Sequence, residues 1–357
     1  DDSPRAVHAL QQHVVPLLEK QPLHHFQELV QQLDLVRETV VETRLVAADT
    51  DQAGKNGQRT ISRRRLISGQ LIAEEPLRKE VPVKRPLPAG LRFGVSQALL
   101  NGAAQSQQKP ARRVLAEAFN LGDGAPTVPL LIDVEKTAAD LVGPLIAKAA
   151  GAVGYNISYH KPQQVLGEDA EKLQAHVRQV KSWLEESVPD AQPAVHLNIA
   201  GGFTDIYEND EGKILGALYG LEQAAKPFPL IIENVVRGDV TAVGQRMKQV
   251  RSYLAFRKMA TKLAAGFDLF APQALAQLVA GQAIDQVRVD LSQFGSIVQA
   301  LHFIADSQAQ GVDMILHDHG QNVATAAAVG LAANVHALSG PAPELYNAIV
   351  KNTAAGL

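Results

Sequence analysis

Residues 228–233 read Phe-Pro-Leu-Ile-Ile-Glu, a short apolar run that ends in a carboxylate. A run of this length with consecutive apolar positions is typical of a strand buried on both faces of a parallel sheet. An amphipathic helix is expected on each side of it, over residues 213–226 and 241–258. Strand and helix thus alternate around this stretch, which favours β/α units.

The same alternation continues in both directions from this stretch. It predicts further strands at 128–133, 152–157, 194–199, 262–270, 286–290 and 314–317, and further helices at 137–150, 168–186, 272–280 and 295–309. Helix 168–186 has four apolar residues on one face, at steps of four, three and four: Leu173, Val177, Val180 and Leu184. Seven or eight such units predict a closed (β/α) barrel of the TIM type. A doubly wound open sheet is the alternative, but no G-x-G-x-x-G follows the first strand.

Residues 1–125 have a different pattern, which predicts a partial α+β domain and a lead-in helix before a barrel domain at 126–357. Helices are expected over 4–35 and 91–103, β-type segments at 40–46 and 66–73, a hairpin connection at 49–58 and a linker at 79–88. The connection is polar and contains glycine, and the linker is charged and rich in proline.

The composition excludes several classes of protein. Lys plus Arg total 34 and Asp plus Glu total 37, so the net charge of -3 provides no basic field for nucleic acid. The chain has no cysteine, which excludes disulfides, thiolate nucleophiles and cysteine-bound metals. No apolar run reaches the ~18 residues that a membrane span needs, and no signal-like segment opens the sequence. We therefore expect a cytoplasmic protein with a small-molecule ligand.

Polar residues follow the predicted strands. In (β/α) barrels the chemistry takes place at the carboxyl ends of the strands. Carboxylates from different strands could share Mg²⁺, which prefers oxygen ligands, and histidine or tyrosine could move protons. The residues at these ends are Asp133, Tyr155, Asn156, Asn198, Glu233, Asp268, Arg288, Asp290, His317, Asp318 and His319.

Glu233 favours a role in a site, because it ends an apolar strand at the expected barrel mouth. Asn198 is explained equally well as a turn residue before Ala200-Gly201-Gly202. It is also a weaker cation ligand than aspartate because it adds no charge. Asp268 has the alternative interpretation of an acid that flanks a helix.

Arg288 and Asp290 are two residues apart on a strand and therefore point to the same side. The simplest interpretation is that they pair with each other. His317 and His319 have the same spacing and are first interpreted as structural or surface residues. With Asp318 they could instead hold a transition metal in a hydrolase.

Residues 224–228, Ala-Ala-Lys-Pro-Phe, followed by Ile232-Glu233, are similar to the region of the fourth strand in the methylaspartate ammonia-lyase family of the enolase superfamily. The similarity covers most of the chain except residues 40–86. It also includes 14–33, Phe-Gly-Val-Ser-Gln-Ala-Leu-Leu at 93–100, 166–173 and His-Leu-Asn-Ile at 196–199. The resemblance implies a (β/α) barrel with a capping domain built mainly from the N-terminus, and a homodimer.

The resemblance also implies a magnesium site. The family holds Mg²⁺ with three acids after strands three, four and five, and the metal stabilises an enediolate. A lysine after strand six removes a proton next to a carboxylate. Carried over by position, the three acids fall at Asn198, Glu233 and Gly266, and the lysine falls at Asp290. Two of the three metal-binding charges are therefore missing.

Three further positions carry over from the family. Its histidine after strand two falls at Tyr155, with His160 a few residues on. A glutamine two residues before the lysine becomes Arg288, and a glutamine after the first strand becomes Asp133. The guanidinium of Arg288 could hold a substrate carboxylate as a planar fork.

Two functions follow as hypotheses. The first is a carbon–nitrogen lyase, or a related lyase or isomerase, that removes a proton next to a carboxylate of a small carboxylate or amino acid. Its residues would be Tyr155, His160 and Asp290 for catalysis, Arg288, Asp133 and His317 for substrate, and Glu233, Asn198 and Asp268 for Mg²⁺. The second is a barrel that has lost the ancestral catalysis and binds a ligand or partner.

Overall fold

The structure, a computed structural model, describes residues 3–354 apart from 20, 24, 47–65, 68–69, 72–76, 123, 126, 136, 138, 158–160 and 209. The chain divides by packing into two compact units. One is formed by residues 1–19 with 33–87, and the other by residues 20–32 with 88–357. The domain boundary expected between residues 125 and 126 stays a prediction.

The second unit contains a closed barrel of eight strands, which confirms the expected fold and excludes the open sheet. Neighbouring strands are parallel around the barrel, in the order β10-β11-β12-β5-β6-β7-β8-β9. The strands are β5 Leu130–Asp133, β6 Ala150–Asn156, β7 Ala194–Asn198, β8 Leu230–Glu233, β9 Lys262–Gly266, β10 Gln286–Asp290, β11 Asp313–His317 and β12 Ala337–Ser339. The last of them was not expected, because three residues are too few for a periodic pattern.

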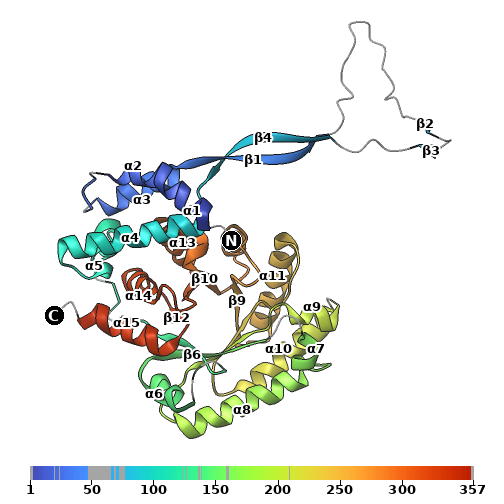
Figure 1. Cartoon of the computed structure of the whole chain (residues 1–357). Coiled ribbons are helices and arrows are strands. Elements are labelled where there is room, and N and C mark those ends of the chain that lie inside the picture. Colours follow the sequence, from blue (N-terminus) through green and yellow to red (C-terminus); the bar gives the residue numbers. More distant parts are fainter. Residues whose placement is uncertain are drawn as a thin grey trace. The chain divides into compact units, whose positions relative to one another are not determined.

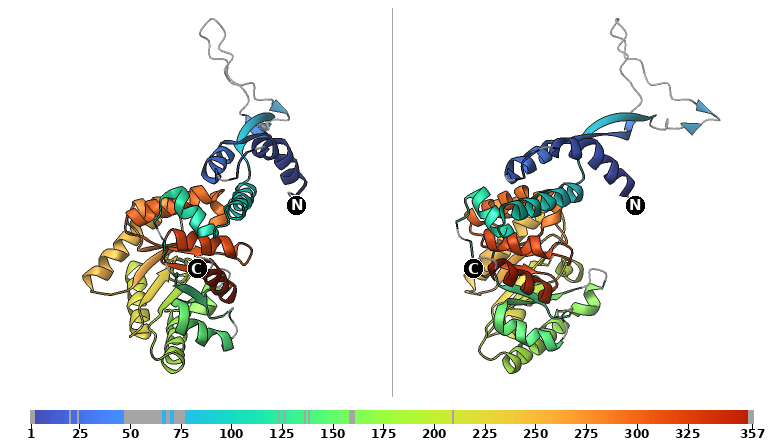
Figure 2. Two further views of the ribbon diagram at one scale, coloured as in Figure 1. Left: turned by 90° about the vertical axis from the view of Figure 1, so that its left-hand side faces the viewer. Right: turned by 60° about the vertical axis from the view of Figure 1, so that its left-hand side comes forward.

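Helices surround these strands (Figures 1 and 2). They are α4 Ala89–Gln107, α5 Ala111–Phe119, α6 Ala139–Ala149, α7 Pro162–Leu166, α8 Glu171–Ser187, α9 Gly202–Tyr207, α10 Glu211–Ala225, α11 Val240–Phe256, α12 Pro272–Ala280, α13 Ile297–Ala309, α14 Val323–Ala332 and α15 Ala342–Ala354, with a 3₁₀ turn at Leu291–Phe294. In α8 three of the four residues of the expected apolar face are buried, Leu173, Val177 and Leu184, and the fourth, Val180, is half-buried.

An apolar layer lies below the carboxyl ends of the strands. Leu131, Ala152, Ile315 and Ala337 form one buried cluster, against which Ala194 packs. Two positions after each of these five residues, its strand carries a polar residue or a glycine. In the same order, these are Asp133, Gly154, His317, Ser339 and His196. Because residues two apart on a strand face the same side, the apolar layer supports the polar residues above it.

The described residues of the first unit form α1 Ser3–Ala9, a π-helical turn at Leu10–Val14, α2 Val15–Leu18 and the strands β1 to β4, while α3 Phe26–Leu35 is divided between the units. β1 Arg37–Val46 pairs antiparallel with β4 Leu77–Pro86. β2 Leu66–Ile67 pairs with β3 Gln70–Leu71. The connection expected at 49–58 lies outside the described residues.

The linker expected at 79–88 is therefore wrong, since most of it belongs to β4. Val81 and Val83 alternate with Glu80, Pro82 and Lys84 at the period of a strand. Proline is tolerated there because each strand of a two-stranded ribbon has a free edge that needs no N–H donor. No helix among the described residues is long and apolar enough to cross a membrane.

Candidate functional site

A cavity of about 860 Å³ opens at the carboxyl ends of the barrel strands. Its wall combines apolar side chains such as Leu131 and Phe267 with a ring of polar groups. The polar residues that line it are Asp133, Thr137, Asn156, His196, Asn198, Asp268, Arg288, His317, Asp318, His319, Ser339 and Glu344. Cavities in this position hold the active sites of (β/α) barrels.

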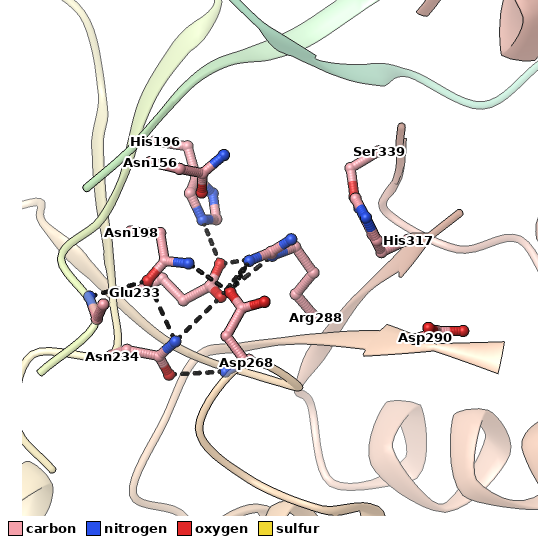
Figure 3. A network of polar contacts seen from close by, with 12 residues as sticks. Asn156, His196, Asn198, Glu233, Asn234, Asp268, Arg288, Asp290, His317 and Ser339 are labelled. Carbon is pink, nitrogen blue, oxygen red and sulfur yellow. Dashed lines mark hydrogen bonds and ion pairs between the residues drawn. The ribbon is translucent and has the colours of Figure 1, made fainter. Parts of the chain in front are cut away.

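A buried ion pair lies beneath one side of the cavity (Figure 3). Nε of Arg288 donates to both carboxylate oxygens of Glu233, at 3.1 and 2.9 Å, and one terminal nitrogen donates to Oε1 at 2.9 Å. Nε2 of His196 lies 2.7 Å from Oε2 of Glu233. Both oxygens of Glu233 are thus engaged by side chains of this chain. Bidentate contact between guanidinium and carboxylate is the strongest arrangement of such a pair.

The environment fixes Glu233 in its charged form. Burial by itself would raise the pKa of this carboxyl, but the charge of Arg288 and the hydrogen bond with His196 outweigh it and lower the pKa to about 2. Burial likewise opposes the charge of Arg288, yet Glu233 and Asp268 raise the pKa of the guanidinium. The pair therefore remains ionised over the whole physiological range.

An amide network holds the neighbouring groups in place. Nδ2 of Asn198 donates to Asp268 at 2.6 Å, and its Oδ1 accepts from Nδ2 of Asn234 at 3.2 Å and from the backbone of Ala200 at 3.1 Å. Asp268 in turn accepts from Arg288. The backbone N–H of Gly266 donates to Oδ1 of Asn234 at 2.9 Å. The side-chain oxygen of Asn198 is thus engaged by two donors of the protein itself.

Gly266 leaves room for the carboxylate of Glu233. A Cβ atom at this position would lie 1.8 Å from Oε1 of Glu233, a distance that no pair of non-bonded atoms can adopt. The observed position of the Glu233 side chain therefore requires a glycine at residue 266.

A second polar group lies on the wall formed by β10, β11 and β12. Nδ1 of His317 lies 2.9 Å from Oγ of Ser339, and Nε2 lies 3.3 Å from Nδ1 of His319. Nε2 of His319 lies 3.5 Å from Oδ2 of Asp290. Phe267 separates this group from the buried ion pair, because its ring stacks on His317 at 4.9 Å and lies 4.7 Å from Cζ of Arg288.

Among the described residues, carboxylates outnumber fixed cations in the cavity wall. Asp133, Asp268, Asp318 and Glu344 line it, and Arg288 is the one guanidinium in that part of the wall. Asp133 accepts from Nδ2 of Asn156 at 3.2 Å. Burial raises the pKa of Asp318, although backbone N–H groups of Gly320 and Asn322 stabilise its charged form.

The structure brings together most of the residues expected from the sequence. Asp133, Asn198, Asp268, Arg288 and His317 line the cavity, and Glu233 contacts Arg288 directly beneath it. The interpretation that Arg288 pairs with Asp290 is wrong. Arg288 instead contacts Glu233 and Asp268, while Asp290 accepts from Ser292 at 2.8 Å and faces His319.

Tyr155 and Asp290, two of the expected catalytic residues, are not among the residues that line the cavity. Tyr155 packs against His176 of α8, with ring centroids 4.0 Å apart, and is not among the lining residues. Its pKa is raised, first by burial and then by the charge of Glu135. A tyrosine with a raised pKa outside the cavity is poorly placed to move a proton. His160 lies outside the described residues.

Sequence reasoning overlooked His196, Asn234 and Ser339 as members of the site. His196 could have been found, because it precedes Asn198 by two residues and so faces the same side of its strand. Asn234 adopts a positive φ of 56°, and its side chain satisfies a backbone N–H, a role that no sequence period reports. Ser339 ends the strand that was too short to detect.

The comparisons with known proteins agree with this geometry. A family model described as the methylaspartate ammonia-lyase C-terminus matches residues 127–342, which is more than half of the chain. The chain belongs to the methylaspartate ammonia-lyase family. The relationship expected from residues 224–233 is thereby confirmed.

The family members that match differ considerably from this chain. Methylaspartate ammonia-lyase 2 of Carboxydothermus hydrogenoformans is 32% identical over 153 residues, which cover 43% of this chain and 37% of that protein. The enzyme of Citrobacter amalonaticus is 27% identical over 197 residues, which cover 52% of this chain and 44% of that protein. The matched part thus spans less than half of either relative.

Solved structures of this family share the fold. The magnesium complex of β-methylaspartase from Clostridium tetanomorphum has a TM-score of 0.75 at 17% identity, covering 99% of this chain and 78% of that one. The Citrobacter amalonaticus enzyme containing (2S,3S)-3-methylaspartic acid has a TM-score of 0.75 at 18% identity, with the same coverage. Muconate cycloisomerase from Pseudomonas fluorescens follows at 0.58 and 13%, covering 96% of this chain and 74% of that one.

The groups at the site do not fit Mg²⁺. Arg288 and His196 occupy both oxygens of Glu233, Gly266 has no side-chain ligand atom, and the side-chain oxygen of Asn198 is bonded within the protein. Among the described residues, no three His, Asp or Glu side chains gather as metal ligands would. The guanidinium of Arg288 already supplies the positive charge that would balance Glu233, and a divalent ion beside it would be repelled.

Proposed function

We propose that the barrel binds a small amino acid or carboxylate in its cavity without Mg²⁺, and that the metal-assisted proton abstraction of its family has been lost. The observation that carries this proposal is the buried pair of Arg288 and Glu233. It places a fixed organic cation against the one family metal ligand that this chain retains.

The charges of the wall support a ligand with both an ammonium and a carboxylate group. One terminal nitrogen of Arg288 has no partner among the described residues and carries no dashed line in Figure 3. Two N–H donors on a charged group that lines the cavity suit a ligand carboxylate. Asp133, Asp318 and Glu344 on the same wall suit an ammonium group.

Two titrations of the purified protein test this proposal. Calorimetry with Mg²⁺ and Mn²⁺ should detect no one-to-one binding to the unmodified chain. In the presence of a chelator, (2S,3S)-3-methylaspartic acid and aspartate should raise the melting temperature, because a ligand that binds only the folded state stabilises it. Succinate, which has no ammonium group, should raise it less.

The matched variant is Asp133→Asn, which removes one carboxylate from the wall and keeps its size. This substitution should weaken the binding of aspartate more than the binding of succinate. The opposite outcome is equally clear. One-to-one Mg²⁺ binding that disappears in Glu233→Gln, together with ammonia release from (2S,3S)-3-methylaspartic acid, would establish an active carbon–nitrogen lyase in place of a metal-free binding protein.

A further inference from the structure

Ser339 occupies a turn between a strand and a helix at the cavity. It ends β12, and α15 begins three residues later at Ala342. Gly340 between them has φ +146°, and a Cβ atom there would lie 2.3 Å from the backbone oxygen of Asp318. Only glycine permits this close approach, so the turn has one shape and holds the serine at the cavity wall.

The hydroxyl of Ser339 belongs to a chain of four side chains whose hydrogens can be assigned consistently. Its oxygen also lies 3.5 Å from the backbone oxygen of Leu316, a longer contact than the one to His317. Ser339 donates to Nδ1 of His317 over 2.9 Å, and Nε2–H of His317 donates to Nδ1 of His319 over 3.3 Å. Nε2–H of His319 then points to the Asp290 carboxylate at 3.5 Å. In this assignment both imidazoles are neutral, and each carries its hydrogen on Nε2.

Three features hold His317 in this orientation. The ring of Phe267 stacks on it with an interplanar angle of 25°. His319 fixes which nitrogen carries the hydrogen, and the oxygen Oδ1 of Asp290 is anchored by the N–H and hydroxyl of Ser292 at 2.8 and 2.7 Å. A hydroxyl, a base within hydrogen-bond reach and a group that orients the base form the pattern of an activated nucleophile.

The same wall supplies donors for a developing negative charge. The first turn of α15, from Ala342 to Glu344, lines the cavity next to Ser339. The N–H groups of a first turn have no partner within their helix, and the helix dipole favours an anion there. Pro341 and Pro343 have no N–H, so Ala342 and Glu344 provide these donors.

We propose that Ser339 is a nucleophile for acyl transfer, that His317 is its general base, and that a small uncharged ester is the class of substrate. Oγ of Ser339 attacks the carbonyl carbon while its proton passes to Nδ1 of His317. The bond to the alcohol oxygen then breaks, and that oxygen takes the proton. Water next attacks the acyl-serine, which releases the carboxylic acid and restores the hydroxyl. Glu344 disfavours an anionic ester.

This inference shares Glu344 and the cavity with the proposed amino-acid site, but it does not rest on that proposal, because its nucleophile and base lie on β12 and β11 and do not involve the pair of Arg288 and Glu233. Failure of amino-acid binding would leave it intact. Its test needs a probe that reacts only with an activated serine.

Diisopropyl fluorophosphate is such a probe, since an activated serine displaces its fluoride and forms a stable phosphoester. Mass spectrometry of the treated full chain should detect one adduct, and fragmentation should locate it at Ser339. Ser339→Ala should take no label. His317→Gln should slow the reaction at least about a hundredfold, the lower end of the contribution of a general base. Ser307→Ala, which removes a buried hydroxyl elsewhere, is the matched control and should react at the unmodified rate.

His319 acts as a positioning residue, and its side chain is 59% exposed, so its replacement leaves the packing intact. His319→Gln should lower the maximal rate of labelling without changing the reagent concentration that gives half of it. Melting temperatures show which variants remain folded. If His317→Gln does not fold, His319→Gln still tests the role of the histidines. An unlabelled Ser339 in the folded, unmodified chain overturns the proposal, as does an unchanged rate in the folded histidine variants.

Discussion

At the scale of single residues, the site depends on the contact between a glycine and a carboxylate. Gly266→Ala should cost about 3 kcal/mol or more, because a Cβ atom 1.8 Å from Oε1 of Glu233 forces the carboxylate away from Arg288 and disrupts a buried pair. Urea unfolding at neutral pH measures this loss. Gly94→Ala is the control, since no atom lies within 4 Å of its added Cβ.

The control substitution should change the free energy of unfolding in the opposite direction. Gly94 lies inside α4, where replacing glycine by alanine should stabilise the chain by roughly 0.5–1 kcal/mol. Equal stability of the two variants would contradict the account of Gly266. The residue is therefore a structural requirement of the ion pair.

The same scale explains what the sequence could predict of the site. Polar residues at strand ends are visible from the pattern alone, and Asp133, Asn198, Asp268, Arg288 and His317 do line one cavity. Partners could not be read from spacing. Arg288 forms its ion pair with Glu233, which is 55 residues away in the sequence, and not with Asp290 on its own strand. Pairing between strands depends on the direction of each side chain within the closed barrel.

At the scale of elements, helix starts were anticipated from amphipathic periods, but their exact ends depend on caps. Asp239 precedes α11 and its Oδ1 accepts from Thr241 at 2.9 Å and from Ala242 at 3.4 Å. Asp239→Ala should therefore cost about 1 kcal/mol of stability, whereas Asp239→Asn, which keeps an acceptor, should be nearly neutral. Urea unfolding of both variants decides this, and an equal loss in both would exclude the cap as the cause.

Elements also show where the sequence misled. Seven barrel strands carry long enough apolar runs to be found, whereas β12 has three residues and is fixed by its neighbours β11 and β5. β4 looked like a linker because its charges and prolines suggest solvent exposure. A ribbon of two strands exposes most of its surface, so the same composition suits an extended strand.

At the scale of the whole molecule, we propose a homodimer, as the family resemblance implies. Phe256, at the end of α11, is 81% exposed, and Tyr219 of α10 is 43% exposed. Arg257 lies between Tyr219 and Tyr253, with its Cζ 5.6 and 6.0 Å from their ring centroids. Exposed aromatic groups together with arginine are typical of interfaces between subunits.

Sedimentation equilibrium should give twice the chain mass of 38.3 kDa. Phe256→Glu should shift the protein toward the monomer, because a charge replaces an exposed apolar ring at the interface. Val41→Glu provides a matched control, since Val41 is 61% exposed on β1 in the other unit. A monomeric unmodified chain would exclude the dimer, and dissociation by both substitutions would exclude this surface as its specific location.

Stability of the molecule against acid should be governed by Glu233. Its pKa falls from 4.5 in the ordinary state to about 2 in the folded chain. A carboxyl with a lowered folded pKa stabilises the fold above its unfolded pKa and loses that contribution as the pH falls through the folded value. Asp313 acts in the same direction. Burial would raise the pKa of this carboxyl, but Lys262 and His336 outweigh burial and lower it. Asp318 has a raised pKa and acts in the opposite direction.

Glu233 should dominate because it is fully buried and bonded at both oxygens, whereas Asp318 is only partly buried. Unfolding free energy should therefore fall between pH 4.5 and 2, by up to about 1.4 kcal/mol per pH unit from this one group. Urea unfolding across this range should show a shallower slope for Glu233→Gln, which at neutral pH should already be less stable by roughly 3–5 kcal/mol. Glu117→Gln, which removes an exposed partner of Lys109, should keep the unmodified slope. If Glu233→Gln kept it too, the acid sensitivity would belong to other carboxylates and the buried pair would not control it.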